Sequence, residues 1–172
     1  MGGLNKSLLS VQGLTLKDST TNRAIFEGLD LDVSRNEIVC LEGPSGSGKS
    51  LTARAITGLL PANIVVDNGQ IIWKESEIGP PRKTLVEEGI LFLFQDTYGC
   101  FNPLYPVGIQ IADPFDLKSG PPATKNVRQK VIDALSYMEV DDPERVYNSR
   151  PTELSGGQLQ RCNFASAMLL EL

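Results

Sequence analysis

Apolar and polar residues alternate near the start of the chain. Leu29, Leu31 and Val33 alternate with aspartates, and two shorter mixed runs cover residues 8–11 and 14–16. A period of two is typical of strands that bury one face, as in an antiparallel sheet. We therefore predict half-exposed antiparallel strands in this part of the chain.

Two later segments are apolar almost throughout. One lies within residues 37–42 and the other covers residues 90–94. Continuous apolar runs of this length indicate strands buried on both faces, as in a parallel sheet. Between them we expect a loop at 63–69, a short strand at 70–73 and a Gly-Pro-Pro turn at 79–81.

Three segments have helical spacing of their apolar residues. They cover residues 50–60, with Pro61 as the stop, residues 125–138, and the stretch that begins near Ser155 and continues to the end of the chain. The intervening residues 96–122 contain five prolines, and we expect them to be mainly loop with short helical pieces.

The strongest chemical motif lies between the first buried strand and the first helix. Residues 43–50 match G-x-x-x-x-G-K-[ST] in full. Its glycines let backbone N–H groups surround phosphates, and the following helix directs its positive end at them. Lys49 adds a cation, and the Ser50 hydroxyl can bind Mg²⁺. The alternative, a glycine-rich turn without a ligand, leaves the lysine and the serine unexplained. The predicted nucleotide-binding residues are Gly43, Pro44, Ser45, Gly46, Ser47, Gly48, Lys49, Ser50 and Leu51.

A second motif, Leu-Ser-Gly-Gly-Gln, covers residues 154–158. Ser155 and Gln158 have the spacing of a capping box at a helix start, which is an ordinary structural feature. The same helix start offers free N–H groups and a positive dipole end, which favour an anion. Taken alone, the motif fits either interpretation.

Together the two motifs resemble the ATP-binding subunits of ATP-binding-cassette (ABC) transporters. The resemblance implies an α/β fold, a P-loop NTPase of ABC type with a parallel-sheet core, an antiparallel β subdomain and a helical subdomain. It implies a nucleotide-binding core at 1–95, a helical subdomain carrying the Q-loop and signature motif at 96–160, and the start of a return to the core at 161–172.

The family also implies roles for residues of the second half of the chain. Two ATP-binding domains face head to tail, so Ser155, Gly156, Gly157 and Gln158 would cap the ATP held by a second ABC ATPase subunit, in a homodimer or heterodimer. Gln95 matches the glutamine that contacts Mg²⁺ and the attacking water. The resemblance therefore makes Gln95 and Lys49 the catalytic residues, and Ser50 and Gln95 the Mg²⁺ contacts.

Residues 94–110 resemble the F-Q-D-P-x-x-x-L-N-P-x-x-x-V-x-x-Q stretch of oligopeptide, dipeptide and nickel importers, although Thr97 and Phe101 replace the usual proline and leucine. This implies an ATPase subunit that energises solute import, peripheral at the cytoplasmic face of the membrane. Transmembrane permease subunits would contact it through the region from Asp96 to Asp116.

Two features depart from the family. Lys17 and Asp18 stand near the position of an adenine-stacking aromatic residue, and the nearest aromatic, Phe26, has the pattern of a strand residue. The family's signature helix is followed by a strand ending in Asp-Glu, which these residues do not include, and Glu171 comes too early to replace it. We therefore expect the chain to be C-terminally incomplete and catalytically incomplete by itself. The alternatives are a nucleotide-binding module without turnover and an ABC ATPase that does not serve transport.

Composition and charge argue against several other kinds of protein and partner. A net charge of −5 disfavours nucleic acid as a partner. No apolar run reaches the roughly 20 residues of a membrane-spanning helix, and the start lacks the pattern of a signal peptide. Three widely spaced cysteines and the lack of histidine argue against disulfides and zinc, and fit the cytoplasm.

Overall fold

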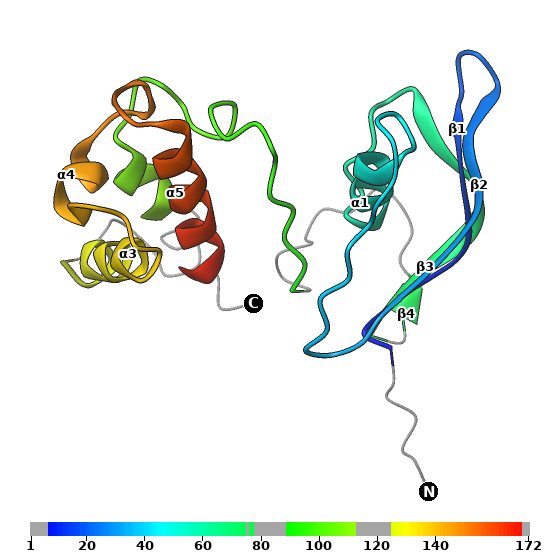
Figure 1. Cartoon of the computed structure of the whole chain (residues 1–172), viewed down its shortest axis with the longest axis horizontal. Helices are drawn as coiled ribbons and strands as arrows, with labels where there is room; N and C mark the ends of the chain where they lie inside the picture. Colours follow the sequence, from blue (N-terminus) through cyan, green and yellow to red (C-terminus); the bar gives the residue numbers. More distant parts are fainter. Residues whose placement is uncertain (1–6, 75, 78–88, 113–124, 170–172) are drawn as a thin grey trace, which may run out of the picture. The chain divides into compact units, whose positions relative to one another are not determined.

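The computed structural model describes residues 7–74, 76–77, 89–112 and 125–169. The chain forms two compact units, Met1–Leu85 and Val86–Leu172 (Figure 1). The turn expected at 79–81 and the loop beyond residue 112 lie outside the described residues.

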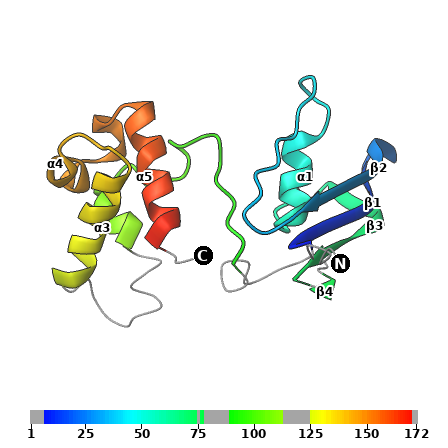
Figure 2. The same ribbon diagram turned by 60° about the horizontal axis from the view of Figure 1, so that its bottom comes forward.

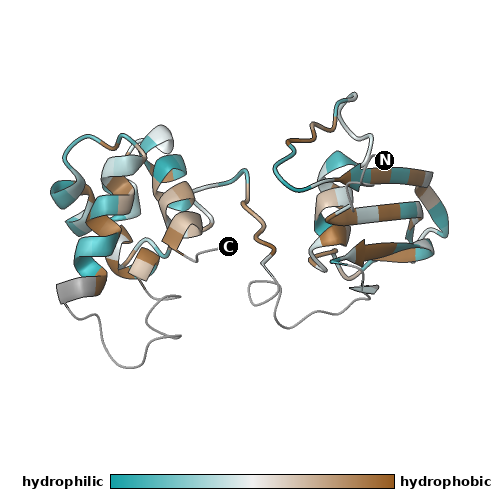
Figure 3. Cartoon of the chain, turned by 90° about the horizontal axis from the view of Figure 1, so that it is seen from below, coloured by the Kyte–Doolittle hydropathy of each residue, from teal (hydrophilic) through white to brown (hydrophobic). Residues whose placement is uncertain are grey.

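The first unit is built on an antiparallel sheet, as the alternating pattern predicts. One inner strand, β1 (Leu9–Asp18), buries Leu9, Val11, Leu14 and Leu16. Figure 3 shows the matching alternation of apolar and polar positions along the strands. The strands are β1 (Leu9–Asp18), β2 (Arg23–Val33), β3 (Ile64–Trp73) and β4 (Ser76–Glu77), in the order β2-β1-β3-β4.

Strand β3 is longer than predicted, because residues 64–69 belong to it and not to a loop. Ile64 pairs with Asp18, and Asn68 pairs with Thr15, across an irregularity in the register. Gly69 has φ +92°, and a Cβ there would lie 2.5 Å from the carbonyl oxygen of Gly13. Residues 67–69, Asp-Asn-Gly, are typical of a turn, but pairing with β1 makes them part of a distorted strand.

A helix lies beside the sheet in this unit (Figure 2). Helix α1 covers Lys49–Ile56 and buries Thr52 and Ala55. It ends earlier than the predicted residue 60, because Gly58 adopts φ +69° just after Thr57. A left-handed glycine of this kind commonly ends a helix.

The two predicted buried strands are wrong for this structure, because residues 37–42 and 90–94 run as coil (Figure 1). A strand needs a hydrogen-bonded neighbour, and no described residue pairs with either segment in a sheet. Consequently Ile38 is 97% exposed and Phe94 43% exposed.

The second unit is helical. Residues 107–112 are helical, and the predicted helices at 125–138 and after Ser155 are confirmed. The Pro143–Asn148 helix was not predicted; it begins at the N-cap Asp142. The named elements are α3 (Lys125–Tyr137), α4 (Pro143–Asn148), the short 3₁₀ helix η1 (Pro151–Glu153) and α5 (Gly156–Leu169). Their shared core includes Val107, Ile111, Val131, Leu135, Val146, Leu159 and Cys162.

Candidate nucleotide-binding site

The glycine-rich loop of the first unit has backbone angles that only glycine adopts easily. Gly43, Gly46 and Gly48 have φ of +153°, +83° and +93°. A Cβ on Gly46 would meet nothing within 4 Å, whereas one on Gly48 would lie 2.5 Å from Cδ1 of Phe26. The glycines therefore serve two purposes: turning the chain before α1, and letting the Phe26 ring approach the backbone.

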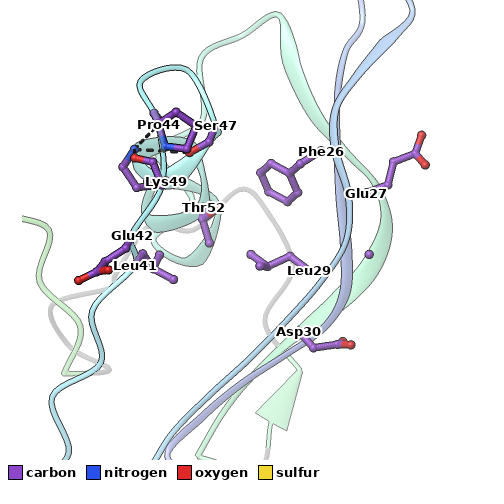
Figure 4. Close-up of a pocket in the computed structure, with 12 residues that line it drawn as sticks. Phe26, Glu27, Leu29, Asp30, Leu41, Glu42, Pro44, Ser47, Lys49 and Thr52 are labelled. Atoms are coloured by element: carbon purple, nitrogen blue, oxygen red, sulfur yellow. Dashed lines mark hydrogen bonds between the residues drawn. The ribbon is translucent and has the colours of Figure 1, made fainter.

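Lys49 folds over the concave side of this loop (Figure 4). Its ammonium group donates to the carbonyl oxygens of Gly43 and Pro44, at 2.9 and 2.8 Å, and lies 3.4 Å from Oγ of Ser47. An ammonium held by neutral carbonyls exchanges readily to a phosphate oxygen, because a charged acceptor makes the stronger hydrogen bond.

A cavity of about 400 Å³ lies between this loop and β2 (Figure 4). Its size is within the range of small-molecule sites. Apolar lining comes from Phe26, Leu29 and Leu41, and Lys49 adds a cationic group to the lining. Phe26 therefore lies in a strand, as predicted, and also lines the cavity.

The serine hydroxyl groups of the loop and of the first turn of α1 are accessible. Ser45, Ser47 and Ser50 are exposed, while Leu51 is half-buried in α1. An exposed hydroxyl in the first turn of α1 fits Mg²⁺, which usually keeps several waters and takes few protein ligands when it is bound with a nucleotide. Loop and helix residues thus fit Mg²⁺-ATP.

Sequence reasoning missed Thr52, which is 3% exposed. Its hydroxyl donates to the carbonyl oxygen of Gly48 at 3.1 Å, and so does its backbone N–H at 2.8 Å. Both bonds fasten the end of the loop to α1. A threonine four residues after the last loop glycine was the available signal.

The second motif forms the capping box that its spacing predicts. The backbone N–H of Gln158 donates to Oγ of Ser155 at 3.2 Å, and the N–H of Ser155 donates to Oε1 of Gln158 at 3.1 Å. Gly156 and Gly157, between them, are exposed in the first turn of α5. Their location leaves the helix start accessible to a ligand.

A cavity of about 350 Å³ lies beside this helix start. Ser155, Gly157 and Gln158 form one side of it, and Val140 and Asp141 form another. Arg161 also lines it, and its guanidinium donates to the carbonyl oxygen of Glu139. This hydrogen bond attaches α5 to the turn after α3.

The predicted site residues are divided between the two units. Lys49 and Ser50 belong to the first, while Gln95 and Ser155 belong to the second. Gln95 is an exposed coil residue. The loop that follows it contacts the turn before Ser155, because the Tyr98 hydroxyl donates to the carbonyl oxygen of Leu154 at 3.2 Å.

The position at which the family has its aromatic platform is occupied by hairpin contacts. Backbone N–H groups of Thr21 and Thr20 donate to the Asp18 carboxylate and lower its pKa. Lys17 forms an ion pair with Asp67 at 3.5 Å. Asp18 therefore stabilises the turn between β1 and β2, and Lys17 links β1 to β3.

The fold and the glycine-rich loop define an α/β protein of the P-loop class. More specifically, the chain belongs to the ABC transporter family, whose model matches residues 26–171. Solved ABC cassettes share the fold, which confirms the predicted class. They include the dimeric bacterial cassette MJ0796, with a TM-score of 0.77, 23% identity and coverage of 95% of this chain and 70% of that one. Another is cbiO1 of Clostridium perfringens, with a TM-score of 0.74, 22% identity and coverage of 96% and 62%.

Relatives in sequence confirm the resemblance to importer subunits. A metal-staphylopine import system ATP-binding protein, CntD of Staphylococcus aureus strain Mu50, is 30% identical over 169 residues, covering 96% of this chain and 62% of that protein. The dipeptide transport ATP-binding protein DppD of Escherichia coli K12 is 34% identical over 172 residues, covering 94% and 51%. This chain therefore spans between about half and 62% of these relatives' lengths. Among the described residues, no helix is long and apolar enough to cross a membrane.

Proposed function

We propose that this chain binds Mg²⁺-ATP and belongs to an ATP-hydrolysing subunit that energises solute import through an ABC transporter. The observation that supports this most is the loop of residues 43–50, whose positive-φ glycines and folded Lys49 border a cavity at the start of α1. Backbone N–H groups and the Lys49 ammonium bind the β- and γ-phosphates, and the Ser50 hydroxyl contacts Mg²⁺.

The second unit supplies groups that act on the γ-phosphate. Gln95 contacts Mg²⁺ and orients the attacking water. Ser155, Gly156, Gly157 and Gln158 bind the ATP held by a second ABC ATPase subunit. The capping box supports this role, because it fixes the Ser155 side chain at a helix start that is accessible and favours an anion.

Permease subunits bind the region from Asp96 to Asp116, at the cytoplasmic face of the membrane. Among its described residues, Leu104, Tyr105 and Ile109 are 71%, 56% and 52% exposed. Large apolar side chains gathered on a surface are typical of protein interfaces. Relatives named for dipeptide and metal-staphylopine transport support a peptide or a small metal chelate, such as a nickel complex, as the transported solute.

Calorimetric titration with Mg²⁺-ATP tests nucleotide binding. We expect Lys49→Ala to abolish detectable binding, because the loop loses the cation that contacts the phosphates. Lys130→Ala, which removes the same charge from an exposed position on α3, serves as the control. Equal affinity of the Lys49→Ala variant and the unmodified chain would refute the phosphate-loop assignment.

Light scattering in the presence of ATP tests the action of Ser155 on a second subunit. We expect Ser155→Arg to prevent ATP-dependent dimerisation while the nucleotide affinity of the single chain stays nearly unchanged. Gln129→Arg, which adds the same charge to an exposed position on α3, is the control. Loss of both properties together would contradict a role in trans.

A further inference from the structure

The loop that follows Gln95 is a series of tight turns within the second unit. The N–H of Gly99 donates to Oδ1 of Asp96 at 3.2 Å, and the thiol of Cys100 donates to the carbonyl oxygen of Asp96 at 3.2 Å. At its far end, Phe101 is 8% exposed and joins the helical core. The residue that follows Gln95 therefore belongs to a short segment anchored in that core.

Tyr98 connects this segment to the signature motif, the Leu-Ser-Gly-Gly-Gln sequence of residues 154–158. Its hydroxyl donates to the carbonyl oxygen of Leu154, at 3.2 Å. Leu154 precedes the N-cap Ser155, so its carbonyl lies outside the hydrogen-bond ladder of α5, in which Ser155 accepts the first bond from Leu159. The tyrosine thus satisfies a group that the helix leaves unpaired.

Two further contacts join the same surfaces. A Cβ on Gly156 would lie 3.9 Å from Cε2 of Tyr98, so the ring edge packs over the first residue of α5. The Asn163 amide lies 4.0 Å from Sγ of Cys100, two residues after Tyr98. Since Leu154 is 4% exposed, the Tyr98 bond ends on a fixed part of the structure.

We propose that Tyr98 is a positioning residue, which holds the Ser155 turn in register with the loop of Gln95. This inference rests on the proposed function of both residues. Gln95 acts on the nucleotide of its own subunit, whereas Ser155 acts on that of the partner. Tyr98 therefore couples the two nucleotide positions of a dimer through one hydrogen bond and one ring contact.

Tyr98→Phe tests this role, because it removes the hydroxyl and keeps the ring. Loss of one neutral hydrogen bond is expected to weaken ATP-dependent dimerisation by roughly 2- to 12-fold, with the single chain's affinity for Mg²⁺-ATP unchanged. Hydrogen exchange should become faster at the amides of residues 155–158 but not in α3. Tyr137→Phe, at a side chain 73% exposed on the same unit, is the control.

The double variant Gln95→Ala/Tyr98→Phe distinguishes coupling from simple packing. If Tyr98 transmits the effect of Gln95, the double variant loses less dimer affinity than the product of the single losses. Multiplicative losses, or faster exchange throughout α3, would overturn the inference while leaving the proposed function intact. A wild-type chain that does not dimerise with ATP would overturn this inference together with the proposed action of Ser155 on a second subunit, and this result would be seen without any Tyr98 variant.

Discussion

From the close approach of Phe26 to Gly48 we predict how much substitutions in the loop of residues 43–50 lower the free energy of unfolding. Gly48→Ala adds a methyl group at a residue with φ +93°, and places it 2.5 Å from Cδ1 of the Phe26 ring. Two separate costs follow. The left-handed backbone costs an alanine about 1–2 kcal/mol, and forcing a methyl group into occupied space costs about 1–3 kcal/mol.

Gly46→Ala is a matched control for the first cost. Gly46 has φ +83°, but a Cβ there would meet nothing within 4 Å. We expect it to lower the free energy of unfolding by about 1–2 kcal/mol. Gly48→Ala should lower it by about 2–5 kcal/mol, because the steric overlap is added to the backbone strain.

Removal of the ring should separate the two costs. In a Phe26→Ala background, Gly48→Ala is expected to cost about 1–2 kcal/mol, as Gly46→Ala does. The single tryptophan, Trp73, lies in β3 of the same unit, so urea titration followed by its fluorescence reports on the correct part of the chain. Equal costs for Gly46→Ala and Gly48→Ala, or an unchanged cost of Gly48→Ala without the ring, would refute the reasoning.

Other predictions concern the helical unit and the thiols. Gly108→Ala would overlap the Tyr147 ring and should lower the free energy of unfolding by about 1–3 kcal/mol, measured by circular dichroism; an unchanged melting curve would contradict the packing. Burial raises the pKa of Cys162 to about 12 from its ordinary 9.0. The contribution of the protonated Cys162 thiol to the free energy of unfolding is complete below pH 9.0 and is lost between pH 9.0 and about 12, at ~1.4 kcal/mol per pH unit. The fall in the free energy of unfolding over this range should therefore be shallower in Cys162→Ala. Thiol titration near neutral pH should modify exposed Cys40 and Cys100, but Cys162 only after unfolding.

The local sequence was sufficient for elements that are stabilised by their own residues. The loop of residues 43–50 has the backbone angles that its glycines allow, and Ser155 and Gln158 form the capping box that their spacing requires. Alternation likewise predicted that β1 buries one face and that Leu29, Leu31 and Val33 of β2 are half-buried between exposed aspartates. Such features depend on residues a few positions apart, so the sequence displays them directly.

Tertiary structure decided the features that depend on contacts between residues far apart in the sequence. Residues 64–69 became a strand because β1 pairs with them, whereas 37–42 and 90–94 remained coil because no described residue does. The Phe26 ring lies against Gly48 only because the chain folds β2 beside the loop of residues 43–50. Folding likewise brings the Tyr98 hydroxyl to the carbonyl oxygen of Leu154. An apolar run or a tyrosine hydroxyl specifies that a partner is needed, but only the path of the chain specifies which partner it finds.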